Sequence, residues 1–345
     1  MLGLSDFDFD LPQELIASRP LDQRDASRML VVNGGAVADK HIRDFLDYLQ
    51  PGDVVVFNNS RVIPARFIAD GKYEITLHTA TKDGYWWGLC KKFKKLKPGR
   101  LLTLEDGTMI GIVSQNMASG IKIKFLCEDV FATLERVGKM PLPPYMKREE
   151  ELADRDRYQT VYSQPLGSMA APTAGLHFTP ELLDEIRARG AKIVNITLHV
   201  GAGTWMQVKT EDLSQHKMHS EWGCITDDQA EIINKATRVI AVGTTSMRLL
   251  ESAAKYNRAP EKYKRVSPFC RTTRIFITPG YKFRVVDVLL TNFHLPKSTL
   301  FMLVSAFAGV NEMRAAYAHA ISQKYRFFSY GDCCLLFKKQ PEQGE

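Results

Sequence analysis

Residues 193–205 read IVNITLHVGAGTW, and this stretch decides how the chain is organised. The apolar run 193–198 is long enough for one buried strand and too short for a helix. His199 follows the run, and Gly201 and Gly203 then leave backbone without side chains, which permits a sharp turn and the close approach of a ligand. A strand that ends in this way is typical of a pocket floor, although a glycine pair alone fits an ordinary tight connection equally well.

Short apolar runs followed by polar residues recur along the chain. Residues 53–57 (DVVVF) read as a strand buried on both faces and precede NNSR at 58–61. Residues 238–242 (RVIAV) precede GTTSMR at 243–248. Strands that alternate with helices predict an α/β main domain with a mixed sheet. Further strands are expected at 29–32, 36–39, 274–278, 285–293 and 333–337, and helices at 298–308 and 312–323. Thr179 as cap, Pro180 in the first turn and Gly190 past the end delimit another helix, and Thr226 with Gln229 predicts a capping box for one more.

Residues 62–140 have a different sequence pattern from the rest of the chain. Short alternating runs are separated there by Asp-Gly, Pro-Gly and Ser-Gly pairs, which supply tight turns. This pattern predicts a small antiparallel β-barrel inserted into the α/β domain. We expect the main domain to comprise residues 1–61 and 141–345, and the barrel domain to comprise residues 62–140.

Composition excludes several classes of protein. The 345 residues are 45% apolar and 25% charged, as in ordinary globular proteins, and carry a net charge of +7 that favours polyanions. No apolar run approaches the roughly 20 residues that cross a bilayer, and the acidic N-terminus lacks a signal pattern, so we expect a cytoplasmic protein without membrane contact. The six cysteines lack metal-ligand spacing and are expected to be reduced thiols.

Residues 243–248 are expected to begin a helix directly after a strand. The first turn of a helix presents free N–H groups and a positive dipole end, which suits a carboxylate or a phosphate near Thr244 and Thr245. Arg248, one turn later, could add a bidentate contact to the same anion. An ordinary threonine cap beside a surface arginine is the simpler alternative.

Several histidines accompany these loops. His219 and Glu221 are two residues apart, so on an extended segment they share one face. With His199 they could suggest a metal site, but their spacing matches no zinc motif, and we expect no metal. Acid–base partners or hydrogen-bonded structural groups fit the pattern better.

Two basic segments could contact a nucleic acid. Residues 91–97 (KKFKKLK) are the densest cluster, and residues 324–332 (KYRFFSYGD) mix basic with aromatic side chains. Such residues can hold phosphates and stack bases. A solvated loop and the edge of a core explain them equally well.

The longer strings resemble the S-adenosylmethionine:tRNA ribosyltransferase-isomerase family of queuosine biosynthesis. The resemblance extends over nearly the whole chain and is weakest in the inserted domain and at Trp205-Met206. The strings are FNNSRVIPAR (57–66), MPLPPY (140–145), APTAGLHF (171–178), TLHVGAGTW (197–205), MHSEW (218–222), AVGTTSMRLLES (241–252), TNFHLPKSTL (291–300) and KYRFFSYGD (324–332).

This resemblance implies an α/β main domain with an inserted β-barrel and an active site near their junction. It implies transfer of the ribosyl portion of S-adenosylmethionine to 7-aminomethyl-7-deazaguanine at the wobble position of tRNA. Isomerisation then gives epoxyqueuosine, with release of adenine and methionine. S-adenosylmethionine is a cosubstrate, no prosthetic group or metal is expected, and we expect a monomer.

Site residues follow from the matching strings. The catalytic shortlist is His177, His199, His219, Glu221 and His294. The residues expected at the cosubstrate are Thr173, Gly175, Gly201, Gly203, Thr204, Trp205, Thr244, Thr245 and Arg248. The basic balance of the chain, rather than the strings, suggests the residues expected at the tRNA, which are Arg61, Arg66, Lys94, Lys95 and Arg326. A non-catalytic tRNA-binding protein and a metal-dependent hydrolase are the rival hypotheses.

Overall fold

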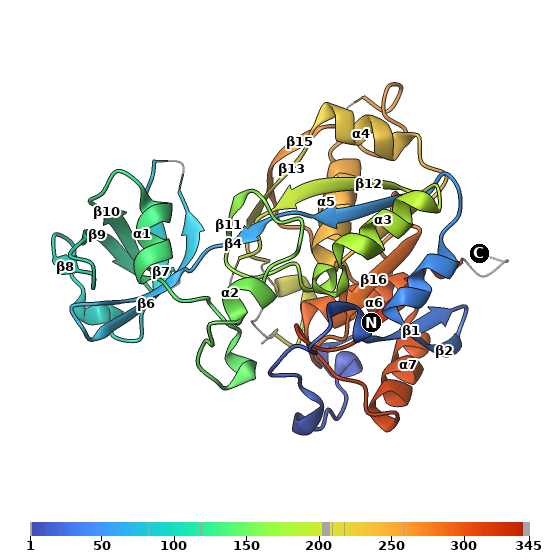
Figure 1. The fold of residues 1–345 in the computed structure, drawn as a ribbon, viewed down its shortest axis with the longest axis horizontal. Coiled ribbons are helices and arrows are strands. Elements are labelled where there is room, and N and C mark those ends of the chain that lie inside the picture. Colours follow the sequence, from blue (N-terminus) through green and yellow to red (C-terminus); the bar gives the residue numbers. More distant parts are fainter. Residues whose placement is uncertain are drawn as a thin grey trace.

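The computed structural model describes residues 2–81, 83–117, 119–201, 208, 210–216, 218–257 and 259–340. A nine-stranded sheet has the order β15-β13-β12-β3-β14-β16-β17-β1-β2, and a six-stranded antiparallel sheet lies to one side of it (Figure 1). The predicted α/β domain with a mixed sheet and an inserted barrel is therefore confirmed. The strands of the large sheet are β1 (Arg28–Asn33), β2 (Ala36–His41), β3 (Val54–Asn58), β12 (Lys192–Leu198), β13 (Glu221–Ile225), β14 (Val239–Val242), β15 (Phe269–Thr273), β16 (Val288–Asn292) and β17 (Cys333–Phe337).

The centre of the large sheet is parallel. Strands β12, β3, β14 and β16 are parallel neighbours, whereas β13 and β15 add an antiparallel margin on one side. Parallel strands are buried on both faces, which explains the continuous apolar runs of β3 and β14. Because these four strands run the same way, their carboxyl ends at Asn58, Leu198, Val242 and Asn292 lie at one edge of the sheet.

Alternate side chains of the central strands enter two separate cores. Val54 and Val56 pack on one face with α4 to α7, whereas Val55 and Phe57 pack on the other face with α3. This division follows from the two-residue period of a strand. The helices of the main domain are α2 (Asp154–Arg157), α3 (Pro180–Ala188), α4 (Asp227–Asn234), α5 (Thr244–Lys255), α6 (Thr299–Ala308) and α7 (Val310–Ser322).

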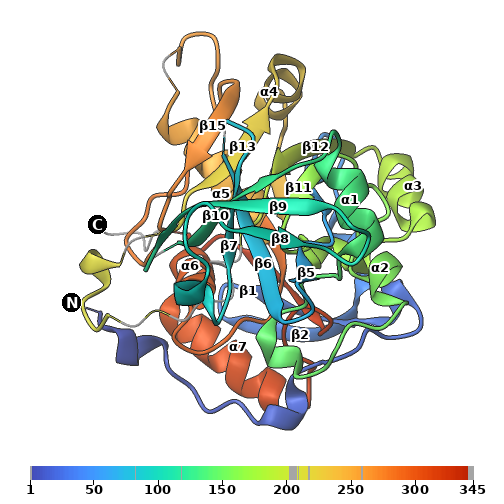
Figure 2. The ribbon, with the colours of Figure 1, turned by 90° about the vertical axis from the view of Figure 1, so that its left-hand side faces the viewer.

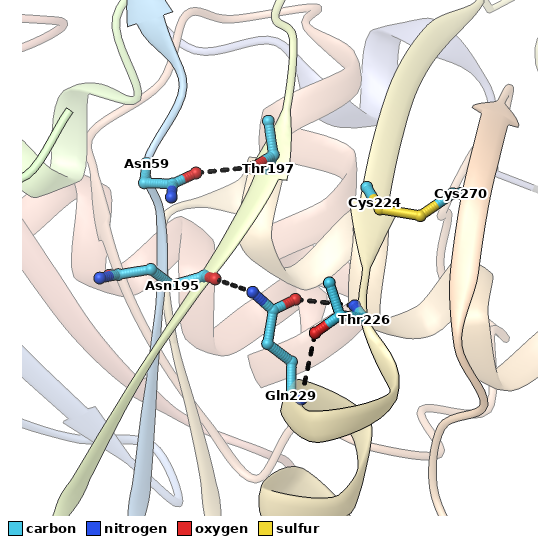
Figure 3. The surroundings of a disulfide bond; sticks show 7 residues. All are labelled: Asn59, Asn195, Thr197, Cys224, Thr226, Gln229 and Cys270. Carbon is cyan, nitrogen blue, oxygen red and sulfur yellow. Dashed lines mark hydrogen bonds between the residues drawn. A yellow bond between two sulfur atoms is a disulfide. The ribbon is translucent and has the colours of Figure 1, made fainter. Parts of the chain in front are cut away.

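Two helix starts follow the predicted capping chemistry. The Thr179 side chain accepts a hydrogen bond from the Leu182 N–H (3.2 Å) and Pro180 begins α3. Thr226 and Gln229 form a reciprocal capping box at the start of α4 (Figure 3). Both caps are short-range interactions, so the sequence predicts them directly.

The smaller sheet forms a nearly closed barrel in the order β5-β6-β7-β10-β9-β8 (Figure 2). A bridge between Ala69 and Leu104 joins its outer strands, and Ile75, Ile112 and Ile123 fill its interior. Neither β5 nor α1 is predicted from the sequence, and the domain boundaries stay a prediction. The elements are β5 (Arg66–Ala69), β6 (Tyr73–Ala80), β7 (Trp86–Leu89), β8 (Leu101–Thr103), β9 (Met109–Asn116), β10 (Gly120–Phe125) and α1 (Val130–Val137).

The strand predicted at 274–278 is wrong. The structure has β15 at Phe269–Thr273 instead, directly before this segment. Residues 274–278 look like a strand because Ile275 and Ile277 are buried in the core. The real strand has exposed polar positions at its centre, as expected for the sheet margin, and so lacks an apolar pattern.

The cysteine prediction needs one correction. Cys224 and Cys270 are joined by a disulfide (Figure 3), whereas Cys90, Cys127 and the adjacent pair 333–334 are free. The two bonded cysteines are 46 residues apart but directly opposite in the antiparallel register of β13 and β15. Spacing along the chain could not reveal this partnership because neither strand was predicted.

No helix in the described part of the chain combines the length and the apolar composition needed to cross a membrane.

A buried ion pair fastens the amino ends of the central strands. Asp53 is fully buried and accepts hydrogen bonds from Arg238 Nε (3.0 Å), Arg238 Nη2 (2.7 Å) and the Gln50 N–H (2.8 Å). Asp53 precedes β3 and Arg238 precedes β14, so the pair ties two neighbouring parallel strands together.

We expect Asp53→Ala to lower the free energy of unfolding by about 3 kcal/mol, because it leaves the Arg238 guanidinium without its partner. Urea denaturation of the full chain measures this change. Asp184→Ala removes an exposed i,i+3 partner of Arg187 and should cost less than about 1 kcal/mol. Equal losses in the two variants would contradict a structural role for Asp53.

Candidate active site

A cavity lies where the four parallel strands end. It is formed by loops from remote parts of the chain: the segment before α3, the end of β12, the β14–α5 junction, the segment after β16, and residues before β17. This is the edge at which open α/β sheets usually bind ligands. The lining comprises Tyr145, Tyr158, residues 170–174, Val200, residues 243–245, residues 291–295, Ser298, Leu300, Phe328 and Ser329.

The start of α5 offers the cavity a site for an anion. Thr244 and Thr245 line the cavity in the first turn, where main-chain N–H groups have no partner within the helix. The Thr245 hydroxyl is buried and has no hydrogen-bond partner in the described part of the chain. This arrangement leaves donors for a carboxylate or a phosphate.

Arg248 lies one turn further along α5. It is 5% exposed and forms an ion pair with Glu221, whose other oxygen accepts the Gly201 N–H (3.1 Å). The Arg248 Nε and Nη2 atoms are buried and find no hydrogen-bond partner among the described residues. An arginine that pairs one of its nitrogens with a carboxylate keeps further N–H donors for a second anion.

His199 follows β12 and faces a polar neighbour. Its Nδ1 lies 2.7 Å from Ser60 Oγ, and its ring stacks on Trp222 with centroids 5.3 Å apart. Gly167 lies against the ring, since a Cβ there would fall 2.9 Å from it. Burial lowers the pKa of His199, so the imidazole is neutral at pH 7 and can accept a proton.

His294 and His177 are both buried. Burial lowers the pKa of His294 to about 3. Burial, and then the nearby Arg24 and Arg326, lower the pKa of His177 to about 4. Both imidazoles are therefore neutral at pH 7 and act as hydrogen-bonding groups there.

Asn292 links His177 to the cavity. Its amide nitrogen lies 3.2 Å from His177 Nε2, and its oxygen accepts a hydrogen bond from Thr173 (2.8 Å). His177 Nδ1 lies 3.0 Å from the Ser27 hydroxyl. Because the amide donates to Nε2, the proton of the neutral imidazole belongs on Nδ1. His177 therefore orients Asn292, which in turn orients Thr173.

An aromatic wall closes the cavity on another side. Tyr145 and Phe328 pack with their ring centroids 4.3 Å apart and their planes tilted by 32°, and the Tyr145 hydroxyl bonds to Ser329. Phe328 has a φ of +73°, a conformation that bulky residues rarely adopt. Such strain persists where the surrounding structure imposes it, and it concentrates at functional sites.

The structure brings eight of the predicted residues to this region. Four line the cavity: Thr173, Thr244, Thr245 and His294. Four lie beside it: Gly201, Arg248 and Glu221 in one hydrogen-bonded group, and His199, which is joined to the cavity through Val200.

Other predicted residues lie elsewhere. His219 is exposed. Burial lowers the pKa of His78 in the barrel, and the nearby His219 lowers it further. Gly175 does not line the cavity, and a Cβ there would fall 2.0 Å from the Tyr162 hydroxyl, so its packing demands glycine. Gly203, Thr204 and Trp205 lie outside the described residues.

The residues predicted for tRNA do not form one patch. Arg61 is exposed near His199, whereas Lys94 and Lys95 are exposed on the barrel. Arg66 is half-buried and pairs with Glu74 (2.9 Å). Arg326 is half-buried, and it donates a hydrogen bond to a main-chain carbonyl near the N-terminus.

Several residues that line the cavity were not singled out from the sequence. Asn292, Tyr145 and Phe328 lie inside strings that the resemblance contains, but nothing local distinguishes them from packing residues. The polar pair Thr291 and Asn292, between the apolar run 288–290 and Phe293, was the available signal. Among the described residues, no group of three or more His, Cys, Asp or Glu side chains could hold a metal ion.

The architecture defines an α/β protein with an inserted barrel and a cavity that combines free donors at a helix start with two aromatic rings. A family model described as queuosine biosynthesis protein matches residues 4–336. The chain belongs to this family, and the resemblance found in its strings is confirmed.

Its relatives are similar over their full length. A protein of Rhodospirillum rubrum named S-adenosylmethionine:tRNA ribosyltransferase-isomerase is 50% identical to this chain, and the similarity covers 96% of each of the two chains. A protein of the same name from Caulobacter vibrioides is 48% identical, and the similarity covers 98% of this chain and 100% of the relative. The crystal structure of S-adenosylmethionine tRNA ribosyltransferase from Thermotoga maritima is 31% identical and has a TM-score of 0.55. That similarity covers 96% of this chain and 99% of the other.

The buried neutral His177 should make stability depend on pH. Below its ordinary pKa of about 6.5 the unfolded chain takes up a proton, whereas the folded imidazole does so only near 4, so the free energy of unfolding falls as the pH is lowered through this window. His177→Gln should reduce the loss between about pH 7 and 5 by about 2 kcal/mol, measured by urea denaturation. The exposed His41→Gln should leave the loss in place, and an unchanged loss in His177→Gln would refute the assignment.

Proposed function

We propose that this chain transfers the ribosyl portion of S-adenosylmethionine to 7-aminomethyl-7-deazaguanine at the wobble position of tRNA, and isomerises it to epoxyqueuosine with release of adenine and methionine. The observation that carries the proposal is the similarity of nearly 50% over almost the whole chain to proteins of this name. S-adenosylmethionine serves as cosubstrate without a prosthetic group, and the protein works as a cytoplasmic monomer.

The carboxylate of the cosubstrate fits the start of α5. The first-turn N–H groups and the Thr245 hydroxyl lie on one side, and the unpaired nitrogens of Arg248 lie one turn on. Glu221 positions Arg248 and offsets part of its charge. The aromatic wall of Tyr145 and Phe328 suits a flat base in the same cavity.

His199 is our choice for the general base. The reaction begins with removal of a proton beside the sulfonium, which requires an unprotonated base near neutral pH. Burial lowers the pKa of His199, and in the tautomer that donates from Nδ1 to Ser60 Oγ, Nε2 is left to take the proton. Ring opening with loss of adenine and attack by the aminomethyl group then follow.

His294 and His177 serve the site as neutral groups. His294 Nε2 lies 3.2 Å from the Thr291 hydroxyl, and His177 acts through Asn292. A buried imidazole with a lowered pKa does not supply an acidic proton at pH 7. We therefore give His177 a positioning role and keep His294 as a hydrogen-bonding contact in the cavity.

The tRNA would cross the junction between the two domains. Arg61 follows Ser60, which contacts His199, and Lys94 and Lys95 lie on the barrel, so the RNA would contact both domains, and we keep Arg66 and Arg326 as further candidates. A net charge of +7 favours such a partner. Phosphate contacts from these residues would position the RNA, while the cavity receives the modified base.

A single assay separates this function from its rivals. Purified protein is incubated with S-adenosylmethionine and tRNA carrying 7-aminomethyl-7-deazaguanine, and released adenine and the modified nucleoside are measured. A non-catalytic tRNA-binding protein would bind the RNA and release no adenine. A metal-dependent hydrolase would lose its activity with a chelator, which this reaction should survive.

We expect His199→Asn to lower kcat at least about 100-fold, because general-base catalysis contributes a factor of this size. Affinity for S-adenosylmethionine, measured by calorimetry, should change little, since the substitution leaves the start of α5 intact. The matched control is His319→Gln, because His319 is a partly exposed histidine that pairs with Asp39. This variant should keep full activity. A normal rate in His199→Asn would remove this residue from the mechanism.

We expect the double substitution Lys94→Ala and Lys95→Ala to weaken tRNA binding and to flatten its salt dependence, because each lost phosphate contact reduces the slope of log K against log salt by about 1. Fluorescence anisotropy at several salt concentrations measures the slope. The matched control replaces Lys235 and Lys255, which are exposed at the far ends of α4 and α5. Equal slopes for the two double variants would show that the barrel lysines face away from the RNA.

A further inference from the structure

A second pocket adjoins the reaction cavity and is lined by cationic side chains. Its walls include Arg24, Arg157, Leu21 and His177, and Ser329 lines both this pocket and the reaction cavity. Neither Arg24 nor Arg157 is among the site residues expected from the sequence.

The Arg24 guanidinium is held by main-chain oxygens. Its Nη2 donates to the Asp156 carbonyl (2.8 Å) and its Nη1 to the Leu176 carbonyl (3.2 Å). It forms no ion pair with any carboxylate of the described residues. Carbonyl oxygens fix the orientation of a guanidinium but leave its positive charge uncompensated.

Arg157 is held in the same manner from the opposite side. Its Nη2 donates to the Leu21 carbonyl (2.6 Å) and its Nη1 to the Asp22 carbonyl (3.0 Å). Its Nε is buried without a hydrogen-bond partner among the described residues, and it too lacks an ion pair there. The pKa of Arg24 is lowered by burial and then by Arg157, so the two cations repel each other.

The carboxylates nearby are occupied by other cations. Asp332 pairs with Arg28 (3.5 Å) and Asp154 pairs with Arg148 (2.6 Å), whereas Asp156 acts on Arg24 only at longer range and forms no ion pair with it. The neighbouring Arg326 also donates a hydrogen bond from its guanidinium to a main-chain carbonyl. The pocket therefore keeps an excess of positive charge that an anion would neutralise.

We infer that Arg24 and Arg157 hold a backbone phosphodiester of the tRNA beside the nucleotide that enters the reaction cavity. Guanidinium groups match the geometry of phosphate oxygens, and an enzyme that takes a base out of the stack must hold the adjoining backbone. The shared Ser329 and the contact between His177 and Asn292 place the pocket at the flank of the cavity. The carboxylate of S-adenosylmethionine has its own site at α5, on another wall.

This inference rests on the proposed function, and its test uses two readouts. Arg24→Gln and Arg157→Gln are compared with Arg24→Lys and Arg157→Lys, which disturb the same carbonyl contacts but keep the charge. Binding of an anticodon stem–loop RNA is measured by fluorescence anisotropy between about 50 and 200 mM salt, and binding of S-adenosylmethionine by calorimetry. Arg189→Gln is the matched control, because Arg189 also donates to a carbonyl, on Leu46, but lies before β12 at the opposite edge of the sheet.

We expect each glutamine variant to bind the RNA about 10-fold more weakly and to reduce the slope of log K against log salt by about 0.7 to 1, with unchanged affinity for S-adenosylmethionine. The lysine variants should retain most of the slope, and Arg189→Gln all of it. Weaker binding of S-adenosylmethionine with unchanged RNA binding would overturn the inference, as would equal losses in the glutamine and lysine variants. RNA binding with the expected slopes but no adenine release by the unsubstituted protein would instead reject the proposed function alone.

Discussion

The parallel register of β12, β3, β14 and β16 is the constraint on which the site depends. Four strands that run the same way must end at the same edge, so the loops that follow them meet even though they are remote in the sequence. The buried pair of Asp53 and Arg238 fastens the opposite ends of β3 and β14. A slip of one residue would exchange the side chains that enter the two cores, for example Val54 and Val56 for Val55 and Phe57. The cavity is thus a consequence of how the sheet is built, and the barrel adds a second surface next to it.

Burial then gives the polar groups at this edge their chemical character. In a site of low dielectric an isolated charge is costly, so His177 and His294 stay neutral and Arg248 is kept with Glu221. The same burial leaves nitrogen atoms of Arg248 available and oriented before a ligand arrives. Preorganised donors of this kind bind an anion without reorganising, which is the property that a catalytic pocket needs.

The pocket of Arg24 and Arg157 follows a different rule. Both guanidiniums are oriented by main-chain carbonyls, which hold them in place without cancelling their charge. Exposed lysines such as Lys94 contribute a diffuse attraction that salt screens, whereas fixed guanidiniums select position. Together the two kinds of cation would first attract an RNA and then fix its register beside the cavity, with the barrel on one side and the α/β domain on the other.

The sequence by itself determined the fold class, the central strands, the helix caps and the family, because these depend on short-range periodicity and on strings of adjacent residues. It also placed Thr244 and Arg248 at a helix start, since one turn of α5 links them. It could not reveal the role of Asn292, the partnership of Cys224 with Cys270, or the position of Arg157. Those depend on contacts between segments tens to hundreds of residues apart, and only the packing of the sheet and its loops decides which of them meet. Burial likewise belongs to the tertiary structure alone, so a histidine in the sequence has no assigned charge until the chain is folded around it.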